Sequence, residues 1–128
     1  GGTSGLGLLT ARWLAQHECT LALASRGGLL AHDAAATWEA IQATKVMALL
    51  LRCDVVEDTH VRRLTAHVHV TGAVRTRGVW HTAGVLADGV LPRQASDALA
   101  RVYAPKAQSA EALHHAFTMV SLSTCTLF

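Results

Sequence analysis

The chain opens on a glycine-rich stretch that leads directly into a helix-like segment, and this junction restricts the folds open to it. The glycines follow the spacing G-x-x-x-G-x-G in Gly1-Gly2-Thr3-Ser4-Gly5-Leu6-Gly7. An apolar stripe at helical spacing follows, formed by Leu6, Leu9, Trp13 and Leu14. A helix N-terminus presents unpaired N–H groups and a partial positive charge, which suits a phosphate. The stretch therefore predicts a pyrophosphate loop, with a flexible glycine-rich terminus as the plain alternative.

Three of the four glycines of this stretch have a predicted role. Gly1 would allow a tight turn, and Gly5 would let the backbone approach a pyrophosphate. Gly7 would let the helix pack closely against a sheet. The predicted stripe of large apolar side chains is expected to be the buried face of the helix.

Composition places the 128 residues in one globular domain, because 51% are hydrophobic and 16% are charged. The apolar run 46–51 is too short to cross a bilayer, and no basic-then-apolar leader opens the chain. We therefore expect no membrane partner. The cysteines Cys19, Cys53 and Cys125 are odd in number and lack metal-type spacing, which favours a reduced, cytoplasmic setting. A net charge of +2 is too small to indicate a nucleic-acid partner.

The eight histidines raise the question of a metal site. His67 and His69 would share a face only on a strand, and His114 and His115 are adjacent. A third ligand at a convincing spacing is missing. We therefore expect no metal site.

Strand-like and helix-like segments alternate along the rest of the chain. Buried strands are predicted at 20–25, 45–51, 78–81 and 119–122. Helices after the first are predicted at 34–43, 57–70, 95–102 and 105–115, with Pro105 opening the last. This alternation predicts an α/β fold, a Rossmann-like doubly wound parallel sheet with helices on both faces. The strand expected before the glycine loop is absent. Counted as the first strand, it belongs between the second and the fourth, so the sheet is expected to be incomplete, either with a gap or with strands that pair wrongly and expose their edges.

Polar residues follow two of the predicted strands. Arg26 lies 19 residues after Gly7, where a dinucleotide fold meets the adenosine ribose. An arginine there accommodates the 2′-phosphate of NADP, whereas an acid would bind the 2′-hydroxyl of NAD. The alternative for Arg26 is a solvated loop residue. Asp54 could accept a hydrogen bond from an adenine amino group or could cap the following turn.

Six motifs fall in one order along the chain: 1–7, Ser25-Arg26, Cys53-Asp54-Val55, His81-Thr82-Ala83-Gly84-Val85-Leu86, Asp88-Gly89-Val90-Leu91 and Ala104-Pro105-Lys106. Together they resemble the ketoreductase domain of modular polyketide synthases, a branch of the short-chain dehydrogenase/reductase superfamily. The ketoreductase of animal fatty acid synthase is a poorer match. The resemblance runs over nearly the whole chain, so 1–128 is expected to be a partial NADP-binding ketoreductase domain.

The resemblance implies an activity and partners. Family members use NADPH to reduce a β-ketoacyl thioester on an acyl carrier protein to a β-hydroxyacyl thioester, beside other synthase domains. The process is polyketide or fatty acid biosynthesis. Leu86-Ala87-Asp88 is close to a Leu-Asp-Asp motif of one stereochemical class, with alanine at the middle position.

The resemblance also implies cofactor-binding residues. The pyrophosphate loop would consist of Gly1, Thr3, Ser4, Gly5, Leu6 and Gly7. The 2′-phosphate site would consist of Ser25 and Arg26. The adenine would contact Asp54 and Val55, and the nicotinamide-side ribose would contact Ala83 and Gly84.

Two catalytic residues are implied in the same way. Lys106 matches the family's lysine, which precedes the serine in this branch, and Ser123 matches the serine if 119–124 is a strand ending in it. The plain alternatives are a solvated first-turn lysine and a strand-end serine. Fewer residues separate the two than the family usually has.

The family's tyrosine protonates the substrate oxygen, and Tyr103, the only tyrosine, lies elsewhere. The C-terminal part of the fold is expected to be missing, and the chain alone is expected to be inactive. Two rival functions are a non-catalytic scaffold half of a synthase and a short-chain reductase acting on a free small molecule. The position of Lys106 upstream of the serine disfavours the second rival.

Overall fold

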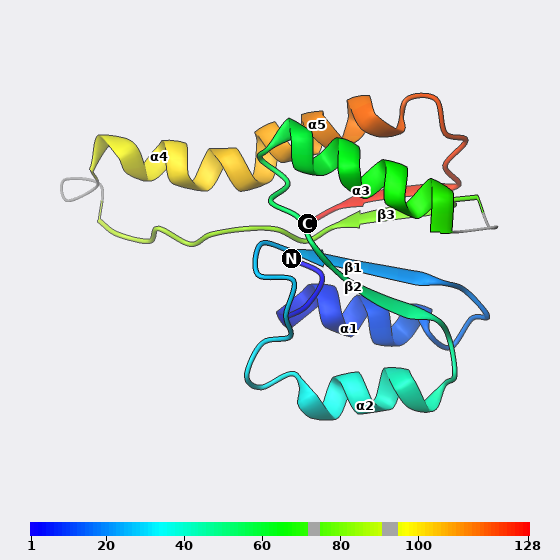
Figure 1. Ribbon diagram of the computed structural model, residues 1–128. Helices are drawn as coiled ribbons and strands as arrows, with labels where there is room; N and C mark the ends of the chain where they lie inside the picture. The colour runs from blue at the N-terminus through cyan, green and yellow to red at the C-terminus, as the bar shows by residue number, and fades with distance from the viewer. Residues whose placement is uncertain (72–74, 91–94) are drawn as a thin grey trace.

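The computed structural model describes residues 1–71, 75–90 and 95–128 (Figure 1), so Leu91 of the fifth motif lies outside the described residues. Strands and helices alternate in the order α1 Gly5–Leu14, β1 Leu21–Ser25, α2 Ala35–Ala43, β2 Ala48–Arg52, α3 Asp58–Thr71, β3 Gly78–His81, α4 Ser96–Tyr103, η2 Ala104–Gln108, α5 Ser109–Phe117 and β4 Thr124–Leu127. This order confirms the α/β prediction. Among the described helices, none is long and apolar enough to span a bilayer.

The strands form two parallel pairs rather than one continuous sheet. β1 pairs with β2 from Leu21 opposite Ala48, and β3 pairs with β4 from Gly78 opposite Thr124. Residues of β1 and β3 both line a cavity of about 660 Å³. The gap therefore lies between β1 and β3, which are the second and fourth strands when the expected leading strand is counted as the first.

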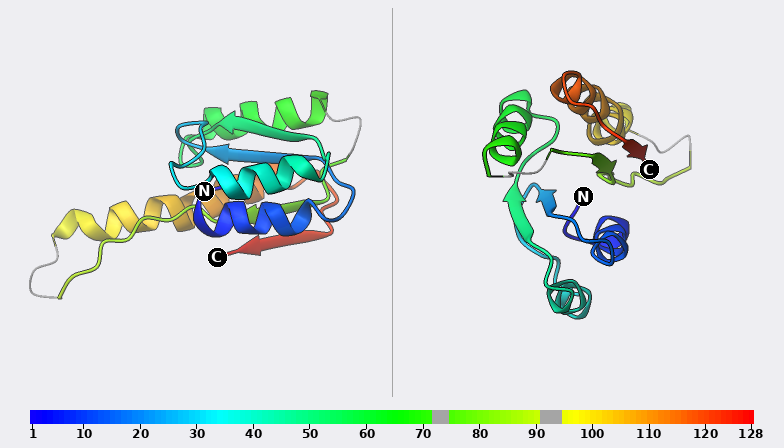
Figure 2. Two further views of the ribbon diagram at one scale, coloured as in Figure 1. Left: turned by 90° about the horizontal axis from the view of Figure 1, so that it is seen from below. Right: turned by 90° about the vertical axis from the view of Figure 1, so that its right-hand side faces the viewer.

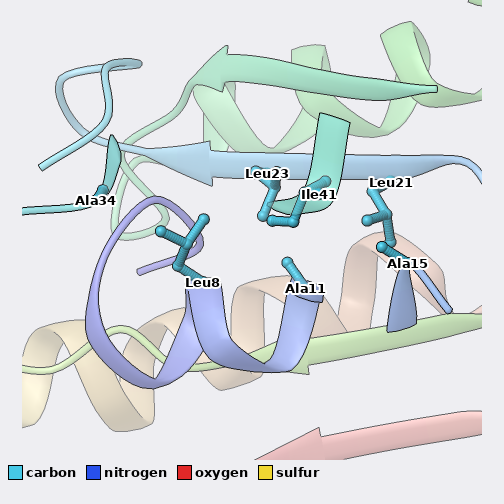
Figure 3. Packing of buried hydrophobic residues seen from close by; sticks show 7 residues of the cluster. All are labelled: Leu8, Ala11, Ala15, Leu21, Leu23, Ala34 and Ile41. Carbon is cyan, nitrogen blue, oxygen red and sulfur yellow. The ribbon is translucent and has the colours of Figure 1, made fainter. Parts of the chain in front are cut away.

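Helices cover the strands on both faces (Figures 1 and 2). α1 and α2 lie on one face, and α3 and α5 lie on the other. The first face encloses a core of Leu8, Ala11, Ala15, Leu21, Leu23, Ala34 and Ile41 (Figure 3). The second encloses a smaller core of Cys53, Val61, Leu113 and Phe117. Helices on both faces of the strands explain why β1 and β2 are apolar over most of their length.

The buried face of α1 is not the predicted one. Leu9 and Trp13 are exposed by 55% and 57%, and of the predicted stripe only Leu14 packs against the first core. Gly7, Leu8 and Ala11 face the strands instead (Figure 3 shows Leu8 and Ala11). Leu8 and Ala11 supply the apolar contacts of this face with the first core, and Gly7 leaves room for the Gly1 carbonyl and Thr82.

The last strand also differs from the prediction, and the assignment of Ser123 depended on it. Residues 119–122 form a turn after α5, with Met119 95% exposed, and β4 begins only at Thr124. The Ser123 N–H donates to the Arg77 carbonyl at 2.7 Å, immediately before β3 begins. Ser123 therefore lies at the amino end of β4, and its prediction as a strand-end residue is wrong. Val120 and Leu122 are apolar because they pack on the second core from the turn.

One nearly straight helical segment replaces the two helices predicted at 95–102 and 105–115 (Figure 1). α4 continues through η2, a π-helical turn that contains Pro105, into α5. Proline lacks an N–H and its ring crowds the carbonyl four residues earlier, here that of Arg101. A wider turn relieves this crowding, so Pro105 widens the helix instead of starting a new one.

Candidate functional site

The glycine loop lies at the carboxyl edge of the strands, against the ends of β1 and β3. The Gly2 N–H and the Gly1 amino group donate to the Ala24 carbonyl at 2.9 Å and 3.3 Å. A Cβ on Gly7 would collide with the Gly1 carbonyl and lie 2.6 Å from Thr82 Oγ1. The close approach of loop, helix and β3 therefore requires glycine at position 7.

The N-terminus of α1 is open toward the solvent beside this loop. Ser4 is the N-cap and makes no capping hydrogen bond through its side chain, so it leaves first-turn amides to other partners. Gly5 has φ +44°, and a Cβ there would meet no atom within 4 Å. Leu6 is half exposed, whereas Thr3 is buried and its carbonyl accepts from the Ala31 N–H at 3.2 Å. Open amides at a helix N-terminus suit an anion such as a pyrophosphate.

A tight turn after β1 carries Arg26. The Gly28 N–H donates to Ser25 Oγ at 3.1 Å, and Gly28 has φ +67°. Arg26 is exposed and directly follows Ser25, the last residue of β1, and the Gly2 N–H of the glycine loop donates to the Ala24 carbonyl of the same strand end. The predicted 2′-phosphate residues and the predicted pyrophosphate loop therefore share one edge.

Asp54 and Val55 follow β2 at the same edge. Asp54 Oδ1 accepts from the Val56 N–H at 3.2 Å, so Asp54 caps this turn, as one of its two alternatives predicts. The Asp54 N–H donates to His60 Nδ1 at 3.3 Å. Val55 packs against the second core and leaves only part of its surface for a ligand.

Lys106 lies beside the residues that follow β3. A Cβ built on Gly84 would lie 3.3 Å from Lys106 Cε, so the lysine side chain runs along this backbone. Both Gly84 and Lys106 are exposed, and Ala83 is half-buried. The structure therefore brings Lys106 to Ala83 and Gly84 but leaves Ser123 at the opposite end of β4.

A buried hydrogen-bond network next to Lys106 was not predicted from the sequence. His81 Nε2 lies 2.8 Å from Ser109 Oγ and 3.3 Å from the Lys106 carbonyl. Because a carbonyl only accepts, Nε2 carries the hydrogen, and Ser109 Oγ donates in turn to the Pro105 carbonyl at 2.6 Å. Burial lowers the pKa of His81. A serine four residues after an internal proline is the signal that could have indicated this link to the π-turn.

Comparison with known proteins fits this geometry. The family model of the KR domain matches residues 1–128. Polyketide synthase GfsB of Streptomyces halstedii is 36% identical over 129 aligned residues, covering 100% of this chain and 2% of that protein. A phenolphthiocerol/phthiocerol polyketide synthase of Mycobacterium tuberculosis is 33% identical over 114 residues, covering 89% of this chain and 5% of that protein.

Solved structures give the same result. The PlmKR1 ketoreductase from the first module of phoslactomycin biosynthesis in Streptomyces sp. HK803 is 30% identical with a TM-score of 0.85. That match covers 98% of this chain and 29% of the other. The family match, the parallel α/β architecture and the glycine loop at the strand ends agree. The chain therefore belongs to the ketoreductase (KR) domain family of polyketide synthases.

Proposed function

We propose that this chain binds NADPH and forms the cofactor-binding part of a cytoplasmic ketoreductase. The reaction is reduction of a β-ketoacyl thioester on an acyl carrier protein to a β-hydroxyacyl thioester, beside other synthase domains. One observation carries the proposal: the glycine loop, the Arg26 turn and Lys106 all lie at the carboxyl ends of parallel strands. Ligands of open α/β sheets bind at this edge.

The residues at this edge fit a phosphorylated dinucleotide. Gly7 lets the start of α1 pack closely on Gly1 and Thr82, and the first-turn amides of α1 have no side-chain cap, which suits the pyrophosphate. Ser25 and Arg26 would hold the 2′-phosphate. The remaining proposed contacts are Asp54 and Val55 for the adenine and Ala83 and Gly84 for the nicotinamide-side ribose.

The bound cofactor supplies a hydride, and the protein supplies orientation and charge. Lys106 places an ammonium group at the end of β3, where it would hold the ribose and favour ionisation of a neighbouring acid. Reduction of a carbonyl builds negative charge on its oxygen, which fixed donors must stabilise. Tyr103 is exposed on α4 and is not proposed as that donor. We therefore propose that the 128 residues alone bind the cofactor without turnover.

Fluorescence titration of the chain with NADPH and with NADH tests the proposal. We expect NADPH to bind at least about tenfold more tightly, since the 2′-phosphate gains charge-assisted hydrogen bonds. The Arg26→Gln variant should lose most of that preference. Equal affinities, or no binding of either dinucleotide, would overturn the proposal and favour a scaffold role. Oxidation of NADPH by the chain with a β-ketoacyl thioester would contradict the expected lack of turnover.

A further inference from the structure

Arg52, the last residue of β2, occupies a position that the proposed function leaves without a role. It lies directly opposite Ser25, the last residue of β1, in the parallel register. The Cys53 N–H donates to the Ser25 carbonyl at 2.8 Å and fixes the two strand ends together. Residues opposite one another in paired strands project to the same face of the sheet, so Arg52 starts on the face that carries the Ser25 hydroxyl.

The turn that carries Arg26 folds over the base of Arg52. A Cβ on Gly28 would lie 2.9 Å from Arg52 Cβ and 3.1 Å from its Cα. The Gly28 N–H also donates to Ser25 Oγ, so this approach is held by a hydrogen bond. Arg26 therefore lies in a four-residue turn, Ser25 to Gly28, whose last residue packs against the backbone and Cβ of Arg52.

The charges at this turn are uncompensated. Arg26 and Arg52 are both exposed, and in the described part of the chain the ion pairs involve other residues. The nearest acid in sequence, Asp54, accepts from the Val56 N–H and caps its own turn. Two like charges on adjacent strand ends repel each other, and a dianion bound between them removes that repulsion.

We propose that Arg52 is a second specificity-determining residue for the 2′-phosphate of the cofactor, acting together with Arg26. The proposal rests on the proposed function, because it assumes that the adenosine end of NADPH lies at this turn. Two guanidinium groups can each donate paired hydrogen bonds to one phosphate. Arg52 then contributes to the preference for NADPH over NADH and not to binding of the shared dinucleotide.

The test compares four variants of the full chain by fluorescence titration with NADPH and with NADH. Arg52→Gln should weaken NADPH binding about tenfold and change NADH binding less than about twofold. Arg52→Lys keeps the charge and should lose only part of the affinity. Arg12→Gln, which removes an exposed charge from the far end of α1, is the matched control and should change neither affinity. Arg26→Gln provides the reference for the whole preference.

The outcomes separate this inference from the proposed function. If the unaltered chain prefers NADPH and Arg26→Gln removes the preference while Arg52→Gln behaves like Arg12→Gln, Arg52 has no such role and the proposed function stands. If the unaltered chain binds both dinucleotides equally, or binds neither, the proposed function itself fails. Circular dichroism melting of each variant verifies folding, and Arg52→Lys supplies the second measurement if Arg52→Gln is unstable.

Discussion

Two regions of the candidate site are made of different kinds of groups, main-chain groups in one and side chains in the other. At the glycine loop, the candidate site consists of main-chain groups: the open amides of α1 and a glycine that no side chain could replace. At the end of β3, it consists of side chains: exposed Lys106 above the buried pair His81 and Ser109. The first half depends on space and the second on specific polar groups, so the two halves should respond to different substitutions.

The largest expected effect comes from filling the space at the glycine loop. Gly7→Val adds a side chain whose Cβ alone would lie 2.6 Å from Thr82 Oγ1 and would collide with the Gly1 carbonyl. The backbone on both sides must move, so we expect a loss of about 3 kcal/mol or more in unfolding free energy. NADPH binding should become undetectable. Urea denaturation followed by circular dichroism measures the first effect, and fluorescence titration measures the second.

Gly27→Ala is the matched control for this substitution. A Cβ at Gly27 would meet its nearest atom, the Leu29 nitrogen, at 3.9 Å, which is ordinary contact. The expected change in stability is within about 0.5 kcal/mol. If Gly7→Val were as stable as Gly27→Ala, the tight packing of α1 against the end of β3 would be wrong.

An intermediate effect is expected from removing the buried hydroxyl beneath Lys106. Ser109→Ala deletes the acceptor of the His81 Nε2–H and the donor to the Pro105 carbonyl. Both remaining groups are then buried with fewer partners, which costs about 1–3 kcal/mol of unfolding free energy. Thermal unfolding measures the loss, and Ser121→Ala, at an exposed serine, should leave stability unchanged. Equal melting temperatures for the two variants would show that the network does not stabilise the π-turn.

A smaller effect is expected from protonation of His81. Burial lowers the pKa of His81 in the folded chain below its ordinary value of about 6.5. At pH values between the ordinary pKa and the lowered one, the His81 side chain binds a proton more readily in the unfolded chain than in the folded chain. The free energy of unfolding is therefore unaffected by His81 above about pH 6.5 and decreases as the pH falls below that value. Urea unfolding at pH 7.5 and 5.5 should show a smaller difference for His81→Gln than for the unaltered chain. An identical difference in both chains would mean that His81 titrates normally.

The same contrast explains what could be predicted from sequence. The glycine loop, Arg26 and the alternation of strands and helices depend on local spacing, and the structure places the loop and the Arg26 turn at one edge of the strands. Lys106, which only the family resemblance implied, lies at the end of β3, beside Gly84. The buried face of α1 could not be predicted from the apolar spacing alone, because apolar residues lie on both sides of this helix: Leu8 is buried, whereas Leu9 and Trp13 are exposed. The pairing of His81 with Ser109 joins residues 28 positions apart, and only tertiary contact reveals it.

The smallest expected effect concerns Ser123, for which sequence and structure disagree most. The mostly apolar residues 119–122 predict a strand, but in the structure they form the connection between α5 and β4 and pack on the second core. Ser123 is consequently exposed and bonded through its backbone to Arg77, at the edge opposite the glycine loop. Because Ser123 makes its hydrogen bond through the backbone N–H, Ser123→Ala should change the affinity for NADPH by less than about twofold and the free energy of unfolding by less than about 0.5 kcal/mol.

Lys106→Ala, measured in the same titration, should weaken NADPH binding, since that side chain lies along Gly84. A larger effect from Ser123→Ala than from Lys106→Ala would place the cofactor at the amino edge and reverse the assignment of the two ends of β3.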